Sequence, residues 1–121
     1  MFVRSLDDCH EFVAGDDSLL REILHPDKAV LDIRYSLAHA TVLPGQTTRR
    51  HRLATAEVYY VIQGTGEMII DEQSEPVHAG DTVYIPPGAV QSIANTGAEE
   101  LVFLCIVDPA WQPQDEEILD K

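Results

Sequence analysis

The chain has 121 residues, of which 45% are hydrophobic, and this fits a single compact domain over residues 1–121. Its formal net charge of −13 at pH 7 repels phosphate backbones and anionic lipids, so neither a nucleic acid nor a membrane is expected as a partner. The sequence has no apolar run long enough to span a bilayer and no signal peptide, and we therefore expect a cytoplasmic protein.

The N-terminal segment GDDSLLREILHPD predicts a helix. Asp16 or Asp17 can cap its first amide groups, and Pro26 ends it. The apolar residues between them fall on one helical stripe: Leu19, Leu20, Ile23 and Leu24. We expect residues 1–28 to form a helical arm that packs on the outside of the domain.

From Val30 onward the apolar pattern changes to a period of two, which indicates strands. Short apolar segments follow at regular spacing: EVYYVIQG, GEMIID, TVYIP, VQSIAN and LVFLCIVD. Turn sequences rich in Gly, Pro and Asn separate them, so residues 30–108 predict an antiparallel sandwich or small barrel. The tail, residues 109–121, is acidic and interrupted by proline, and is expected to form at most a short helix.

Two of these strands, VYYVI and LVFLCIV, are apolar on both alternating faces. A strand with one wet face should alternate between apolar and polar residues, so both faces are expected to be covered. One face packs on the core, and we expect a second copy of the chain to cover the other face in a homodimer. The alternative is that the N-terminal helix and Trp111 cover that outer face.

The stretch PGQTTRRHRLATAEVYYVIQG, from Pro44 to Gly64, contains the residues most typical of a metal site. Residues two apart on a strand point the same way, so His-x-His would present two imidazoles to one metal. Here His51 is followed by Leu53 at the second position. Glu57 shares its strand face with Tyr59, and a buried carboxylate must be paired or bound to a cation. We therefore expect Glu57 in a pocket.

This spacing resembles the cupin superfamily, whose members share two motifs. The first motif corresponds here to Gly45, His51, Leu53, Glu57 and Gly64. The second corresponds to Gly80, Pro86, Gly88, Gln91 and Asn95. Eight of the ten marked positions match, and the resemblance spans residues 36–107. It implies an all-β fold, a double-stranded β-helix or jelly-roll barrel, here with a short N-terminal helix.

Cupins usually bind a divalent ion through three histidines and one glutamate. The resemblance assigns a ligand role to His51 and Glu57, and a weaker one to Gln91, whose amide is a neutral donor. Leu53 cannot coordinate an ion. The resemblance thus implies a degenerate site for Mn, Fe, Ni or Zn, whose affinity is reduced by several kcal/mol relative to the roughly 10–16 kcal/mol of a full structural zinc site.

Four further residues bear on the site. His39 shares the face of Leu37 and could replace the missing imidazole, or it is an edge or interface histidine. The arginines on either side of His51 could attract an anionic small molecule, or they are solvated residues at a strand start: Arg49, Arg50 and Arg52.

Two functions follow from the resemblance. The first is a metal-dependent isomerase or dioxygenase relative that acts on a small metabolite, including an anionic one, and the chain resembles the cupin domain of mannose-6-phosphate isomerase-like proteins. The alternative is a non-catalytic module that binds a small molecule, which Leu53 favours because it makes the pocket drier and poorer in ligands. A purely structural dimer is a third, weaker interpretation.

Overall fold

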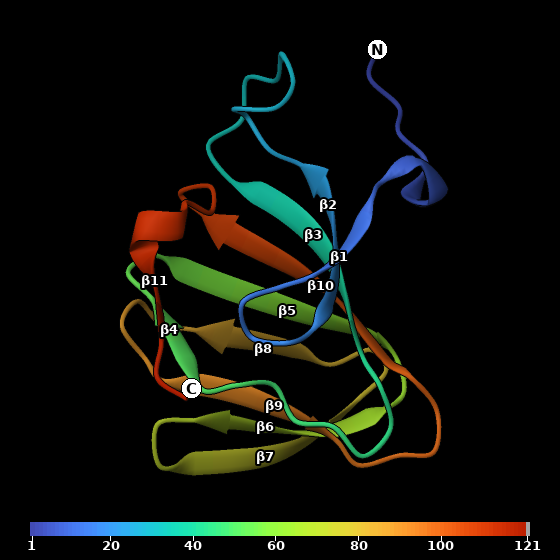
Figure 1. The fold of residues 1–121 in the computed structure, drawn as a ribbon, viewed down its shortest axis with the longest axis vertical. Coiled ribbons are helices and arrows are strands. Elements are labelled where there is room, and N and C mark those ends of the chain that lie inside the picture. The colour runs from blue at the N-terminus through green and yellow to red at the C-terminus, as the bar shows by residue number, and fades with distance from the viewer. Residues whose placement is uncertain (121) are drawn as a thin grey trace.

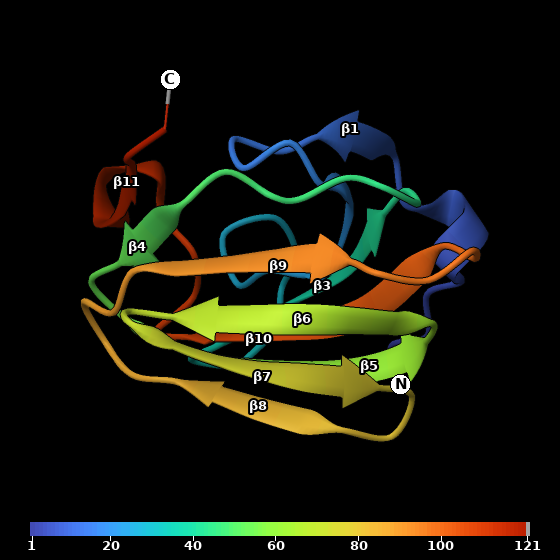
Figure 2. The ribbon, with the colours of Figure 1, turned by 90° about the horizontal axis from the view of Figure 1, so that it is seen from below.

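The computed structural model describes residues 1–120 and consists of two antiparallel sheets (Figure 1). The six-stranded sheet contains, in order, β1 (Glu11–Val13), β2 (Leu19–Leu24), β3 (Ser36–Val42), β10 (Leu101–Asp108), β5 (Ala56–Gln63) and β8 (Thr82–Ile85). The five-stranded sheet contains β11 (Glu116–Ile118), β4 (His51–Leu53), β9 (Gln91–Asn95), β6 (Thr65–Ile70) and β7 (Gln73–His78). Figure 2 shows β9, β6 and β7 as one layer, with β10, β5 and β8 behind them. The predicted jelly-roll barrel is confirmed.

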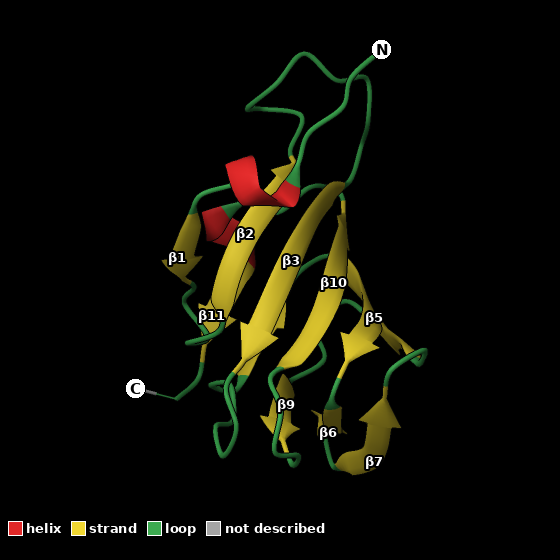
Figure 3. Cartoon of the chain, turned by 90° about the vertical axis from the view of Figure 1, so that its right-hand side faces the viewer, coloured by secondary structure: helices red, strands yellow, loops and turns green. Residues whose placement is uncertain are grey.

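Helical structure in residues 1–120 is limited to two 3-10 turns, η1 (Leu6–Asp8) and η2 (Pro113–Asp115) (Figure 3). In this part of the chain no helix has the length and apolar character needed to cross a membrane.

The prediction of an N-terminal helix is wrong, because this segment forms the β1–β2 hairpin. Leu19 and Leu20 pair with β3 in antiparallel register. At the turn, the backbone N–H and the hydroxyl of Ser18 both donate to Asp16 Oδ1, at 3.0 and 2.7 Å, and Asp17 adopts a φ of +75°. An aspartate that could cap a helix can equally close a turn. Here the segment forms a strand because it pairs with the free edge of β3.

The C-terminal tail also differs from the prediction, since it ends in a strand and not in a helix. β11 pairs with the edge of β4, with Glu116 opposite Leu53 and Ile118 opposite His51. Glu117 of β11 lies beside Arg52 of β4, which donates a hydrogen bond to it. Edge pairing and charge complementarity together extend the five-stranded sheet by one strand.

The core lies between the two sheets and is built from the inward positions of their strands. The largest fully buried apolar side chains are Phe103, Ile85, Ile93, Leu101 and Val61. The rings of Tyr59 and Phe103 pack with centroids 4.4 Å apart, and both also line the pocket described below. The alternating burial along β5 and β10 confirms the period-two prediction for these strands.

The motif glycines occupy turns. Gly45, Gly64, Gly80 and Gly88 all have a positive φ, which L side chains rarely adopt. At Gly64 the backbone is also crowded, because an added Cβ would lie 2.7 Å from the carbonyl oxygen of Glu100. The spacing of the glycines in the two motifs is therefore set by the positions of these turns.

Asn95, the last residue of the second motif, holds two chain segments together from a buried position. Its Nδ2 donates to the carbonyl oxygens of Val42 and Glu99, at 2.9 and 2.8 Å, and its Oδ1 accepts from the N–H of Gly97. Replacing Asn95 by Ala should lower the free energy of unfolding by about 2–4 kcal/mol, because buried backbone groups lose their partners. Urea denaturation measures the change.

The matched control for Asn95→Ala is Gln63→Ala, which removes one exposed amide-to-carbonyl hydrogen bond to Glu100. Its cost should stay within about 0.5 kcal/mol. Equal losses in the two variants would contradict a structural role for Asn95.

Candidate functional site

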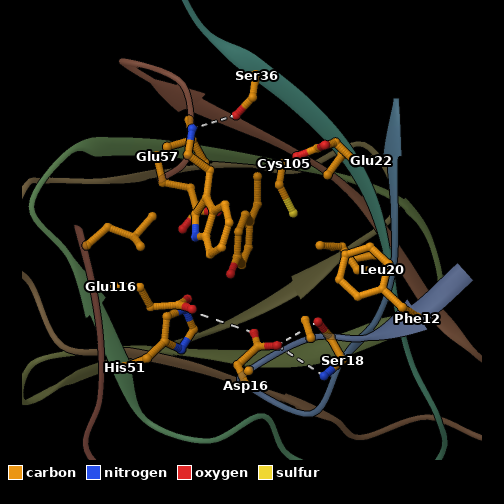
Figure 4. A pocket seen from close by; sticks show the side chains of 18 of the residues that line it. Phe12, Asp16, Ser18, Leu20, Glu22, Ser36, His51, Glu57, Cys105 and Glu116 are labelled. Carbon is orange, nitrogen blue, oxygen red and sulfur yellow. Dashed lines mark hydrogen bonds and ion pairs between the residues drawn. The ribbon is translucent and has the colours of Figure 1, made fainter. Parts of the chain in front are cut away.

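A cavity of about 180 Å³ lies between the two sheets, beside the β1–β2 hairpin and β11 (Figure 4). Its walls come from β3, β4, β5 and β10, and the hairpin loop and Glu116 lie along it. A cavity of roughly 150 Å³ is large enough to hold benzene. The pocket is therefore sized for a molecule slightly larger than benzene.

His51 reaches this pocket because β4 alternates, with His51 and Leu53 buried and Arg52 exposed. His51 Nδ1 lies 2.9 Å from the carbonyl oxygen of Arg49, which can only accept a hydrogen bond, so Nδ1 carries a proton. In the neutral ring Nε2 then has a free lone pair, and it lies 3.9 Å from Asp16 Oδ2. The backbone thus fixes both the tautomer and the direction of the ring.

Glu57 is buried and belongs to a chain of side-chain hydrogen bonds. Gln91 Nε2 donates to Glu57 Oε1 at 2.9 Å, and the Tyr59 hydroxyl donates to Gln91 Oε1 at the same distance. The predicted inward direction of Glu57, Tyr59 and Val61 is confirmed by their burial. Both polar ends of Gln91 are therefore occupied within the protein.

Burial raises the pKa of Glu57 to about 8, an effect that the Gln91 amide partly offsets and that Asp16 and Glu116 increase. Burial also raises the pKa of Tyr59 well above its ordinary value, so its hydroxyl remains a donor. At neutral pH the Glu57 side chain is thus mainly an uncharged carboxylic acid that carries a proton into the pocket.

Two acidic residues that the sequence did not indicate as site residues, Asp16 and Glu116, complete the site. Asp16 is buried in the hairpin loop, and Glu116 is half-buried on β11; Figure 4 shows both beside His51. Desolvation raises the pKa of Glu116, His51 lowers it, and Asp16 raises it further. Both residues lie outside the cupin motifs, and only the strand pairing of the chain ends brings them to the pocket.

The arginines around His51 lie outside the pocket lining. Arg49 is paired with Asp17, Arg50 with Asp120 and Arg52 with Glu117, each through an exposed ion pair. The structure therefore brings none of the three arginines to a ligand in the cavity.

His39 is also absent from the pocket lining. Ala38 and Ala40 of β3 line the cavity, and His39 lies on the opposite parity, in register with Leu104 of β10. Of the two interpretations of His39, the replacement imidazole is therefore not met in this pocket, because the inward face of β3 carries small residues.

The residues at the four family metal positions do not fit a metal as they are arranged. Leu53 is buried and apolar, and the amide of Gln91 is committed to Glu57 and Tyr59. Only His51 and Glu57 retain donor atoms toward the pocket. Within residues 1–120 no group of three or more His, Cys, Asp and Glu side chains is placed to hold an ion.

Comparison with known proteins agrees with this fold. A family model described as "Cupin domain" matches residues 38–107, more than half of the chain. The chain belongs to the cupin family.

Three relatives of this cupin differ in length and printed name. "Uncharacterized protein MJ1618" of Methanocaldococcus jannaschii is 38% identical over 110 residues, 90% of this chain and 87% of that protein. The oxalate-binding protein of Thermotoga maritima is 32% identical and covers 74% of this chain and 69% of its own. Glucose-6-phosphate isomerase of Thermococcus kodakarensis is 30% identical over 76% of this chain, which spans 47% of that enzyme.

Solved structures share the fold at lower identity. Oxalate decarboxylase from Bacillus subtilis has a TM-score of 0.83 at 22% identity, over 96% of this chain and 31% of that one. A likeness at this level concerns the fold alone.

The raised pKa of Glu57 predicts a pH-dependent stability. Between its ordinary pKa of 4.5 and the folded value of about 8, the folded state holds a proton that the unfolded state has lost. The free energy of unfolding should therefore fall as the pH rises through this interval, by on the order of 3–5 kcal/mol. Glu57→Gln should remove most of this slope, as measured by urea denaturation at pH 5, 6, 7 and 8 at one protein concentration.

Glu75→Gln is the matched control, because Glu75 is exposed on β7, and it should keep the slope of the unaltered protein. A slope in Glu57→Gln equal to that of the unaltered protein would show that Glu57 is ionised in the folded state at neutral pH.

Proposed function

We propose that this cupin binds a small organic molecule inside its barrel and contacts it directly with His51 and Glu57. The proposal depends on one observation above all, namely that the polar ends of Gln91 are both occupied while His51 Nε2 still faces the cavity. The side chains that meet the pocket are therefore suited to hydrogen-bond a molecule. The rest of the lining is largely apolar, as is usual for small-molecule sites.

The pocket is arranged to exclude water from a bound molecule. Aromatic rings line it together with the polar groups: Phe12, Tyr59, Phe103 and Trp111. Inside such a cavity a hydrogen bond to His51 or Glu57 is stronger than in water. The relative named as an oxalate-binding protein supports a binding role for this type of barrel in general.

The second candidate is a metal-dependent isomerase or dioxygenase relative. The orientation of His51 favours it, because a metal-ligating imidazole commonly donates its other N–H to a carbonyl, as Nδ1 does here to Arg49. Leu53 and the occupied Gln91 count against it, since they leave two donor side chains where the family has four.

We also propose that the protein is a homodimer that joins the outer face of the six-stranded sheet to its copy. The outward positions of β5, β8 and β10 form an apolar surface, with the charged Asp108 only at the end of β10; the apolar members are Val58, Tyr60, Ile62, Tyr84, Leu104 and Ile106. No N-terminal helix covers this face within residues 1–120. A twofold axis through it would bury the patch against itself.

A cavity-filling variant tests the proposed binding function. Ala38 lines the pocket, so Ala38→Leu should fill part of the cavity and weaken the binding of fragments with about eight non-hydrogen atoms by more than about tenfold. Ligand-observed NMR with a fragment library measures this. His39→Leu, on the same strand but facing away from the cavity, should bind as the unaltered protein does.

Metal analysis of protein purified without a histidine tag, after loading with Mn²⁺, Fe²⁺, Ni²⁺ and Zn²⁺, separates the two candidates. We expect well below one ion per chain. A stoichiometric metal that is lost in His51→Ala would replace the proposed function by the metal-dependent candidate.

The proposed dimer predicts a mass of twice 13.4 kDa in size-exclusion chromatography with light scattering. Tyr60→Glu places a charge on β5, the middle strand of this apolar face, and should shift the protein to a monomer. Val30→Glu, at an exposed apolar residue in a loop away from this face, should remain dimeric. A monomer in the unaltered protein would contradict the proposal.

A further inference from the structure

The polar groups that face the cavity beside His51 are hydrogen-bond acceptors. His51 uses its Nδ1–H on the Arg49 carbonyl and turns its Nε2, an acceptor in the neutral ring, toward the pocket, although the residue is only 3% exposed. Asp16 Oδ1 receives both donors of Ser18, which leaves Oδ2 on the side of His51, and Glu116 lies beside them (Figure 4). Within residues 1–120 the ion-pair partner of His51 Nε2 is Asp16 Oδ2 at 3.9 Å, which is beyond hydrogen-bond distance. A ligand here must supply donors.

Positive charge is scarce in the pocket lining. Among the described residues, Lys28 is the single lysine or arginine that lines the cavity, and its Nζ is paired with Glu22 and its side chain is 67% exposed. The carboxyl groups of Asp16 and Glu116, by contrast, both lie beside His51 along one small cavity. Carboxylates brought this close repel one another, and a bound cation would offset that repulsion.

The aromatic lining suits the same class of ligand. Phe12, Tyr59, Phe103 and Trp111 surround the cavity with ring surface, and such rings attract a cation placed over their faces. The main chain of Trp111 is held on both sides: its N–H donates to Ser36 Oγ at 2.9 Å, and its carbonyl accepts from His25 Nε2 at 2.7 Å. The backbone that carries this ring is therefore held in place beside the cavity.

The spacing of the acidic groups distinguishes an organic cation from a metal ion. Asp16 comes from the β1–β2 loop, Glu57 from β5 and Glu116 from β11, and no three such groups in residues 1–120 stand close enough to share one ion. An ammonium group with an apolar substituent spreads its N–H donors and its apolar surface over several ångströms. It can reach dispersed acceptors and aromatic rings together.

We propose that the pocket selects a small organic cation, namely a primary ammonium group carrying a compact apolar substituent, over neutral and anionic molecules of the same size. This inference rests on the proposed small-molecule function and names the class of ligand for that pocket.

Three probes of nearly equal size test the inference: benzylammonium, benzyl alcohol and benzoate. Chemical-shift titrations with ¹⁵N-labelled full-length protein at pH 7 measure their affinities. We expect benzylammonium to bind about ten times more tightly than benzyl alcohol, because charged hydrogen bonds and cation–π contacts are added, and benzoate to bind most weakly.

A matched pair of variants locates the effect. Glu116→Gln removes a carboxylate that faces the pocket, and Glu117→Gln removes its neighbour, which is paired with Arg52 outside it. Glu116→Gln should weaken benzylammonium binding by about fivefold or more and leave benzyl alcohol unchanged. Glu117→Gln, with the same change in net charge, should leave all three affinities unchanged.

The remaining outcomes overturn the inference in distinguishable ways. Equal affinities for the three probes, or a preference for benzoate, would refute the selection of cations and leave the small-molecule function standing. If Glu116→Gln and Glu117→Gln weakened benzylammonium binding equally, the preference for the cation would come from the net charge of the protein and not from the pocket. Binding of Mn²⁺ without binding of benzylammonium would assign the acidic groups to a metal site and refute the inference. Binding of none of the probes would also refute the selection of an organic cation. In that case the fragment screen with Ala38→Leu tests separately whether the pocket binds small molecules.

Discussion

The buried carboxyl of Glu57 is the constraint on which the arrangement of the pocket depends. A carboxyl group removed from water must find a hydrogen-bond partner, and Gln91 supplies one from the facing sheet. The carbonyl end of the Gln91 amide is then buried as well, and the Tyr59 hydroxyl satisfies it. Three inward side chains on two strands become one fixed chain of hydrogen bonds. The same chain removes Gln91 from the set of groups that could contact a ligand.

The ends of the polypeptide complete the pocket that the central strands begin. Asp16 arrives on the N-terminal hairpin and Glu116 on the C-terminal strand, and both meet His51 on β4. The arginines near His51 lie outside the pocket, where Arg49 forms an ion pair with Asp17 of the hairpin and Arg52 with Glu117 of β11. Exposed ion pairs contribute little stability individually. Their role here is positional, because they join the hairpin and β11 to the strand that carries His51.

The sequence predicts the central barrel and the direction of Glu57 well, because turn glycines and period-two burial are local properties. It predicts the chain ends poorly, because their structure depends on pairing with strands far along the chain. Asp16 and the leucines after it suit a helix, and only the edge of β3 makes them a hairpin. His39 was placed by counting apolar neighbours, whereas the inward face of β3 is the less apolar one, with Ala38 and Ala40. Asp16 and Glu116 carry no local signal at all.

The two positions at which this chain departs from the cupin motifs, Leu53 and Gln91, are both metal positions of the motifs and not turn positions, and this explains why the fold tolerates them. Gly64 and Asn95 keep a turn and two chain segments in place, whatever the pocket binds. Leu53 needs only to fill an inward site, and Gln91 needs only to satisfy Glu57. The motif thus contains some residues that the barrel fold requires and others that the bound metal requires. The fold can be kept when the metal-binding residues have changed. A match to the motif is therefore strong evidence for the barrel, while the ligand must be inferred from the groups that face the cavity.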